Sequence, residues 1–164
     1  RLTFYHIFDI MDSVRIQRAM SLALTPVRNS NKGEGILKIQ QSAEDYLETI
    51  LVLSRKKSQI RSIDIVNELG YSKPSVSVAM KNLRENGYIS MDRDGYITLE
   101  EPGLRIAETI YERHTFLTGF LVCLGVSPET AAEDACRMEH VISPESFQAM
   151  KRFAEKNLKE QDVR

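Results

Sequence analysis

Apolar positions between residues 42 and 86 recur at helical spacing in three successive blocks. The block SAEDYLETILVLS carries apolar residues three and four apart after a capping serine, which predicts a helix over 42–54. The block RSIDIVNELG predicts a short second helix that begins at Ser62 as its cap and ends at Gly70. The block SKPSVSVAMKNLRENG predicts a third helix, with Ser72 as its cap and Gly87 as its terminator.

The pattern then changes to strand alternation. Ile89 and Met91 precede the dipeptide Asp94-Gly95, and Ile97 and Leu99 follow it, which predicts a β-hairpin. Helix, short helix, glycine turn, polar-faced helix and hairpin is the element order of a winged helix-turn-helix. We therefore predict a winged helix-turn-helix DNA-binding domain over residues 41–101.

The remainder of the chain is predicted to be all helix, so the fold class is mainly α. Residues 102–125 carry a broad apolar face, and two Ser-Pro-Glu sequences, at 127–129 and 143–145, predict helices over 128–140 and 144–159. Helices with such wide apolar faces in a small module need a partner. We therefore predict that residues 102–164 form a homodimer, which would present two winged helices to a palindromic DNA site.

The first 40 residues show no sustained periodicity and include the turn-rich sequence TPVRNSNKGEG. We interpret residues 1–40 as a flexible N-terminal arm, in which Met20 is a possible natural start. His6 lies in this arm and is not expected to bind a metal.

Charge separates the two modules, although the net charge of the whole chain is only −1. Residues 51–99 hold eight basic and five acidic residues, whereas residues 100–164 hold eight basic and twelve acidic residues. A basic middle segment favours a nucleic-acid partner. The third helix also has a small, polar and cationic face, which suits approach to a major groove, although a merely solvated face would look the same. The candidate DNA contacts are Ser72, Lys73, Ser75, Ser77, Lys81 and, at the hairpin tip, Arg93.

The cysteine count and the absence of long apolar runs bear on location. Two cysteines are too few for a disulfide framework, and no stretch approaches the roughly 18 apolar residues of a membrane span. We therefore expect a cytoplasmic protein without a membrane partner. Cys123 lies in an apolar run and is expected to be part of the core.

The sequence DACRMEHVIS contains the most suggestive chemistry in the chain. If it is helical, Cys136, Glu139 and His140 lie at i, i+3 and i+4 on one face, which is a spacing suited to metal ligands. The alternative is a buried cysteine beside a solvated Glu-His pair. Asp45 and Glu48, three apart on the first helix, could supply more ligands. No nucleophile elbow and no paired E-x-x-H motif is present, so we do not predict an enzyme.

Four stretches together resemble a known family. AEDYLETI, SKPSVSVAMKNLRENGYI, YERHTFL and EDACRMEHVIS resemble the metal-dependent repressors of the diphtheria toxin repressor and manganese transport regulator type, over residues 42 to about 155. The resemblance implies a winged helix joined to a helical dimerisation domain, with a divalent metal between them that switches on DNA binding. It also adds Pro74 to the DNA contacts. The metal ligands that it implies are Asp45, Glu48, His114, Cys136, Glu139 and His140.

The resemblance is mixed within the family. Asp45, Glu48 and His114 fit the manganese-type members, whereas Cys136 is the iron-type residue where manganese-type members carry Glu. Thr118 and Ala132 replace the Glu and His of the ancillary site of iron-type members. The chain is similar to a short form that lacks the SH3-like domain of longer members. We expect Mn²⁺ or Fe²⁺ as the cofactor, with Co²⁺ or Zn²⁺ able to substitute in vitro.

Two other functions remain open on the sequence. A metal-independent winged-helix regulator would use the acidic cluster to respond to another signal. A small metalloenzyme would need an open coordination position with an acid or base beside it, and no residue is identified for that role.

Overall fold

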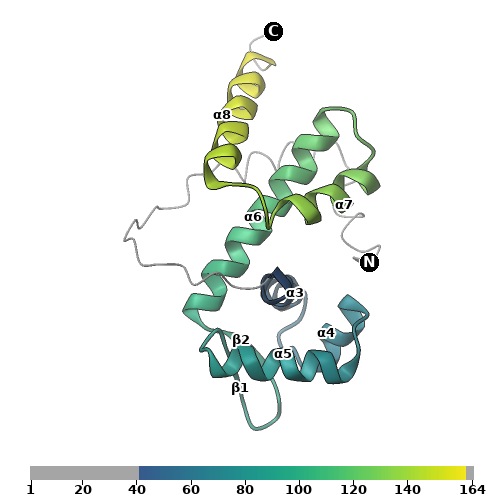
Figure 1. The fold of residues 1–164 in the computed structure, drawn as a ribbon, viewed down its shortest axis with the longest axis vertical. Helices are drawn as coiled ribbons and strands as arrows, with labels where there is room; N and C mark the ends of the chain where they lie inside the picture. Colours follow the sequence, from purple (N-terminus) through teal and green to yellow (C-terminus); the bar gives the residue numbers. More distant parts are fainter. Residues whose placement is uncertain (1–40, 162–164) are drawn as a thin grey trace. The chain divides into compact units, whose positions relative to one another are not determined.

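The computed structural model describes residues 41–161 of the 164-residue chain, and these residues form two compact units, 41–111 and 112–161 (Figure 1). The predicted arm, with Met20 and His6, lies outside the described residues. The described chain is mainly helical, as predicted. In order, the elements are α3 (Gln41–Lys56), α4 (Ser62–Leu69), α5 (Lys73–Glu85), β1 (Ile89–Met91), β2 (Ile97–Leu99), α6 (Glu101–Cys123), α7 (Pro128–Met138) and α8 (Pro144–Gln161).

The first unit forms around α3. An uninterrupted run of eight buried residues, 46–53, lets α3 contact α4, α5 and β2. Leu47 and Ile50 are fully buried there, together with Ile65 from α4 and Val76 from α5. The core of the DNA-binding unit therefore surrounds the helix that carries Asp45 and Glu48.

The start of α4 differs from the prediction. Ser62 is the first helical residue, and Arg61 is the cap. The Arg61 backbone N–H donates to Asp64 Oδ2 at 2.9 Å, and Lys57 Nζ lies 2.6 Å from Asp64 Oδ1. Asp64 performs the capping that we expected of Ser62, because its side chain reaches back to the backbone that enters the helix. The helix ends at Gly70 with φ 68°, as predicted.

The third helix, α5, begins as predicted. Ser72 Oγ accepts a hydrogen bond from the Ser75 backbone N–H at 3.3 Å, and Pro74 stands in the first turn. Val76, Met80 and Leu83 form its buried face. The opposite face is therefore exposed and open to a partner.

The predicted hairpin is confirmed, but its turn is longer than a two-residue Asp94-Gly95 turn. β1 and β2 are antiparallel, with Met91 opposite Ile97. The Asp92 carboxylate accepts hydrogen bonds from the backbone N–H groups of Asp94 (2.9 Å) and Tyr96 (2.8 Å). Asp92 thus organises the whole loop, a role that the dipeptide signal did not reveal.

Gly103 lets α6 start in direct contact with this hairpin. A Cβ atom at position 103 would lie 2.1 Å from the backbone oxygen of Tyr88, the residue that precedes β1. No side chain fits this space. The first part of α6 therefore belongs to the DNA-binding unit.

The second unit consists of the rest of α6 with α7 and α8. Its core contains Phe116, Leu117, Ala135 and Phe147, and the rings of Phe116 and Phe147 meet edge to face. At the border of this core, Lys151 Nζ lies 2.6 Å from Glu112 Oε1 and ties α8 to α6.

Two predictions for this unit were wrong in detail. The helix expected over 128–140 ends at Met138, although the Glu139 N–H still bonds to the Ala135 carbonyl. Cys123 is exposed rather than part of the core. The side chains of α6 become more exposed after residue 119. The last apolar residues of this helix are therefore not packed against other described residues as closely as residues 116–119 are. None of the helices in residues 41–161 is long and apolar enough to cross a membrane.

Candidate metal centre and DNA-binding surface

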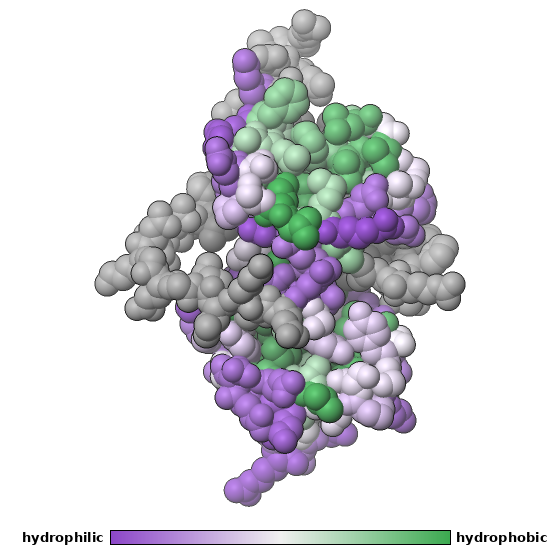
Figure 2. Space-filling model, viewed as in Figure 1, coloured by the Kyte–Doolittle hydropathy of each residue, from purple (hydrophilic) through white to green (hydrophobic). Residues whose placement is uncertain are grey.

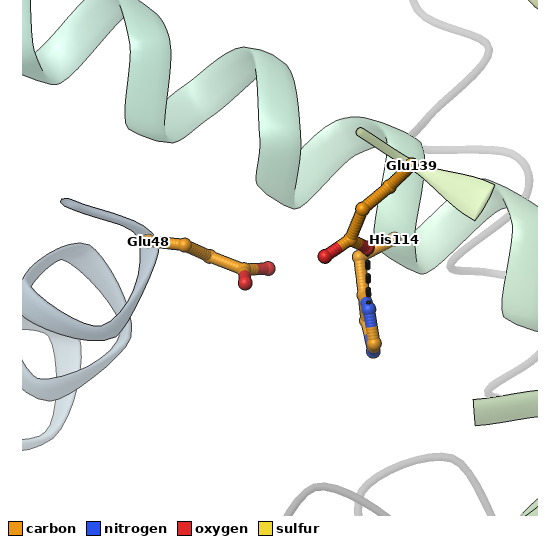
Figure 3. A group of neighbouring side chains, drawn as sticks. All are labelled: Glu48, His114 and Glu139. Carbon is orange, nitrogen blue, oxygen red and sulfur yellow. Dashed lines mark hydrogen bonds and ion pairs between the residues drawn. The ribbon is translucent and has the colours of Figure 1, made fainter. Parts of the chain in front are cut away.

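The Glu139 carboxylate lies between two imidazoles. His114 Nδ1, from α6, is 2.7 Å from Glu139 Oε2, and His140 Nε2 is 3.3 Å from Glu139 Oε1. Figure 3 shows the bond between His114 and Glu139 as a dashed line. Two of the predicted ligands, His114 and His140, therefore each lie beside a third, Glu139, and His114 is 25 residues away from it in the sequence.

All three side chains are shielded from solvent. Glu139 is fully buried, His114 is 3% exposed, and the side chain of His140 is 2% exposed. Burying a carboxylate is costly unless charges or hydrogen bonds compensate for lost water. Carboxylate oxygen and imidazole nitrogen are also the donors that first-row divalent metals accept. The donor set and its burial thus fit a divalent cation.

Arg113, which sequence reasoning missed, supports this cluster. Arg113 Nη1 donates to the backbone oxygen of Glu139 at 2.9 Å, and the guanidinium lies over the Phe147 ring at 5.9 Å from its centroid. These contacts fix the C-terminal end of α7 beside α6. No motif marked Arg113, because its role depends on a backbone atom 26 residues away.

Cys136 lies on α7, three residues before Glu139, and is half-buried. Because the Glu139 N–H continues the helical bonding to Ala135, the predicted i, i+3 relation between Cys136 and Glu139 holds. His140 follows in a turn rather than in the helix. The contact between His140 and Glu139 is therefore set by the end of α7 and not by a continuous helical face.

Asp45 and Glu48 stand on α3 in the first unit. They lie in one helical turn, and Glu48 is buried whereas Asp45 is half-buried. The Thr49 hydroxyl donates to the Asp45 backbone oxygen at 2.8 Å. Figure 3 also labels Glu48, which lies on α3. A buried glutamate on the central helix of a DNA-binding unit is unusual, because folding alone would favour an apolar residue there.

Thr118 and Ala132, the residues at the ancillary positions, are both buried in the second unit. Neither carries a carboxylate or an imidazole. The described structure offers no substitute for a Glu-His pair at these two positions.

The predicted DNA contacts lie on the exposed side of α5 and at the hairpin tip. All seven predicted contacts are exposed: Ser72, Lys73, Pro74, Ser75, Ser77, Lys81 and Arg93. Ser72 also serves as the helix cap, and its hydroxyl lies 2.7 Å from that of Ser75. Lys81 is 3.8 Å from Glu85, a separation that holds an exposed pair only weakly.

Family comparisons match both units of the chain. Residues 38–96 match the family described as "Iron dependent repressor, N-terminal DNA binding domain". Residues 100–161 match "Iron dependent repressor, metal binding and dimerisation domain".

Individual proteins give the same result. The transcriptional regulator MntR of Escherichia coli O157:H7 is 38% identical over 114 residues, which are 70% of this chain and 74% of MntR. An uncharacterised HTH-type transcriptional regulator of Methanocaldococcus jannaschii, MJ0568, is 34% identical over 120 residues, which are 72% of this chain and 96% of that protein.

Solved structures are also similar. The manganese regulator SloR matches with a TM-score of 0.62 and 26% identity, over 69% of this chain and 53% of SloR. A manganese-dependent transcriptional repressor in complex with manganese matches with a TM-score of 0.62 and 26% identity, over 67% of this chain and 51% of that chain. The present chain spans about half the length of these solved structures.

Proposed function

This chain belongs to the iron-dependent repressor family, and we propose that it represses transcription by binding operator DNA as a homodimer when Mn²⁺ or Fe²⁺ is bound. The observation that carries the proposal is the buried Glu139 carboxylate between His114 and His140. The family and the relatives are transcriptional regulators and not enzymes, in agreement with the sequence analysis.

We assign the metal site to the six residues predicted from the sequence. His114, Glu139 and His140 supply the buried part of the site in the second unit, and Cys136 stands one turn earlier on α7. Asp45 and Glu48 on α3 complete the ligand set in this proposal. The ligands therefore come from both the DNA-binding unit and the dimerisation unit.

The charges of these residues explain how binding acts as a switch. Asp45, Glu48 and Glu139 are all acidic, so in the apo protein they repel one another when the two units approach. A bound divalent cation supplies the positive charge that lets the carboxylates gather. The form in which both units share the site then becomes the populated one. A change from 1% to 99% of that form needs a difference in metal-binding free energy of roughly 5.5 kcal/mol.

Dimerisation is proposed to use the apolar surface of the second unit. Phe153 on α8 and Leu124 after α6 are 59% and 64% exposed. Figure 2 shows green apolar surface in the region that Figure 1 draws as α6, α7 and α8. A two-fold dimer would cover this surface and present two α5 helices to a palindromic operator. Such a regulator acts where the DNA is, so we propose a cytoplasmic location.

A selection experiment tests the proposal directly. The full chain is incubated with a pool of randomised DNA duplexes in Mn²⁺, in Fe²⁺ without oxygen, and in EDTA. We expect enrichment of a palindromic sequence only with metal. Equal enrichment in EDTA would support a metal-independent regulator, and no enrichment under any condition would overturn DNA binding through α5.

Variants then connect the switch to the buried cluster. Glu139→Gln keeps the shape of the side chain but removes the negative charge, so metal should no longer raise the affinity for the selected duplex. Glu145→Gln removes an exposed carboxylate at the start of α8 and serves as the matched control. Equal activation of both variants would contradict the role of Glu139.

A further inference from the structure

Val78 is an exposed aliphatic residue in the middle of the proposed DNA-binding face. It lies on α5 and is 59% exposed. At about 100° per residue, it points about 140–160° around the helix axis from each of the buried residues Val76, Met80 and Leu83. Val78 thus lies opposite the core and contributes little to the packing of its own unit.

The neighbours of Val78 on the helix are residues that suit a nucleic acid. Pro74 lies one turn before it and Lys81 lies nearly one turn after it, and both are exposed. A lysine in this position favours a phosphate backbone nearby. The proline and the valine together form a small apolar spot on an otherwise polar surface.

Folding does not explain a valine at this position. Single exposed apolar residues are common in proteins, but valine is a weaker helix former than alanine or lysine because its branched side chain loses rotamer freedom. The Val78 side chain is also mostly exposed, so it buries little apolar area within this chain. A ligand that buries the two methyl groups would give the valine a function.

We infer that Val78 contacts the C5-methyl group of a thymine in the operator and thereby helps to set sequence specificity. This inference rests on the proposed function, in which α5 enters the major groove. Thymine is the base that presents an apolar group in that groove. Valine has no hydrogen-bonding group, so it would leave the amino group of cytosine or adenine dehydrated and without an acceptor.

Uracil substitution tests the contact, because uracil differs from thymine only by the missing methyl group. Duplexes selected by the Mn²⁺-loaded wild-type chain are remade with each thymine replaced in turn by uracil, symmetrically in both half-sites. Each buried methyl contact contributes about fourfold to binding, and because every symmetric duplex loses two of them, binding should weaken about 15-fold. We expect this penalty at one thymine position of each half-site.

The Val78→Ala variant completes the cycle. It should bind the thymine duplex more weakly than the wild type does, and uracil at the same position should then cost nothing further. Val78→Ile keeps the apolar contact and should retain the preference for thymine. Ile63→Ala, which shortens a 43% exposed aliphatic residue on α4, should leave every uracil penalty unchanged.

Two results would overturn the inference. If uracil penalties in Val78→Ala equal those of the wild type at all positions, Val78 does not contact a thymine methyl group. If no uracil substitution weakens the wild type, the operator has no such contact at all. Either result leaves metal-dependent selection of a duplex intact, whereas failure of that selection would overturn the proposed function itself. Thermal unfolding of each variant confirms that the fold is kept.

Discussion

Cys136 is the residue on which the choice of metal depends in our proposal. Thiolate ligands favour softer ions, and affinity along the first-row series rises from Mn²⁺ through Fe²⁺ and Co²⁺. The other five proposed ligands are carboxylates and imidazoles. The Cys136 sulfur is therefore the one proposed ligand atom that is neither oxygen nor nitrogen. Cys136 is half-buried on α7, where a solvent-derived ligand could also compete.

We predict that Cys136→Glu moves the preference toward Mn²⁺ without abolishing activation. In the wild-type chain, Fe²⁺ or its air-stable substitute Co²⁺ should bind more tightly than Mn²⁺. In Cys136→Glu the difference between Co²⁺ and Mn²⁺ should shrink by about tenfold or more, which corresponds to about 1.4 kcal/mol. Metal titrations read out by DNA binding measure this ratio. Cys123→Ser, which changes the exposed cysteine at the end of α6, is the control. An identical ranking in both forms would mean that Cys136 is not a ligand.

Asp64 should make the stability of the DNA-binding unit depend on pH. The Lys57 ammonium, followed by the Arg61 backbone N–H, lowers the pKa of the Asp64 carboxyl below its ordinary value of 3.8. A carboxyl with a lower pKa in the folded state stabilises the fold above its unfolded pKa, and this stability is lost as the pH falls through the folded pKa. The capping contribution at pH 7 is about 1 kcal/mol.

We therefore predict that Asp64→Asn lowers the free energy of unfolding at pH 7 by about 1 kcal/mol. Because the wild type loses the same contribution when Asp64 is protonated, the difference in stability should begin to shrink near pH 4 and should disappear only below the lowered pKa of the folded state. Urea denaturation at a series of pH values checks this. A constant difference from pH 7 down to pH 3 would show that the ionised carboxylate is not responsible.

At the scale of elements, Gly103 is the residue at which α6 packs against the backbone of Tyr88, the residue that precedes β1. Alanine at this position would place a Cβ atom 2.1 Å from the Tyr88 backbone oxygen, so α6 or the hairpin must move. We predict that Gly103→Ala destabilises the protein by about 1–3 kcal/mol, the range for overpacked sites. Glu108→Ala, an exposed change on the same helix, should be nearly neutral. Thermal unfolding compares the two, and equal midpoints would contradict the contact.

The elements also show what the sequence can predict and what it cannot. Ser72 and Gly70 were correctly predicted as helix boundaries, because capping hydrogen bonds and a positive φ are local requirements. The capping role of Asp64 was missed, because its carboxylate reaches back from inside α4 to the backbone N–H of the cap residue, Arg61. The contact of Gly103 with Tyr88 and that of Arg113 with Glu139 could not be predicted, because each joins segments that only the fold brings together.

The candidate site shows the same division. Helical spacing predicted one face for Cys136, Glu139 and His140; Glu139 caps α7 and keeps helical bonding to Ala135, whereas His140 lies in the turn that follows. The bond between His114 and Glu139 spans 25 residues, and spacing alone does not predict it. The resemblance to a family supplied that pairing, because it carries information about the fold that a single sequence lacks. Cys123 was misplaced for a related reason, since an apolar run does not reveal whether its own chain or a second copy covers it.

At the scale of the whole molecule, the proposed switch requires that the metal bind ligands from both compact units of the chain. α3 is the helix that connects this requirement to DNA binding, because it carries Asp45 and Glu48 and also supplies the core that supports α5. A carboxylate on α3 therefore need not contact DNA to control it. In the proposed switch, the carboxylate controls DNA binding because it can reach the metal in only some positions of the DNA-binding unit.

We predict that Asp45→Ala separates metal binding from DNA binding. Asp45 is half-buried at the border of the α3 core, so its removal should leave the fold and the dimer intact. The variant should still bind a divalent ion through His114, Glu139 and His140, but added Mn²⁺ should raise its affinity for the selected duplex far less than it does in the wild type. Glu44→Ala, which removes the neighbouring carboxylate in the first turn of α3, should be activated normally. Light scattering, metal titration and DNA binding on the same samples measure the three properties separately. Full activation of Asp45→Ala would remove this residue from the switch and would leave Glu48 as the proposed ligand on α3.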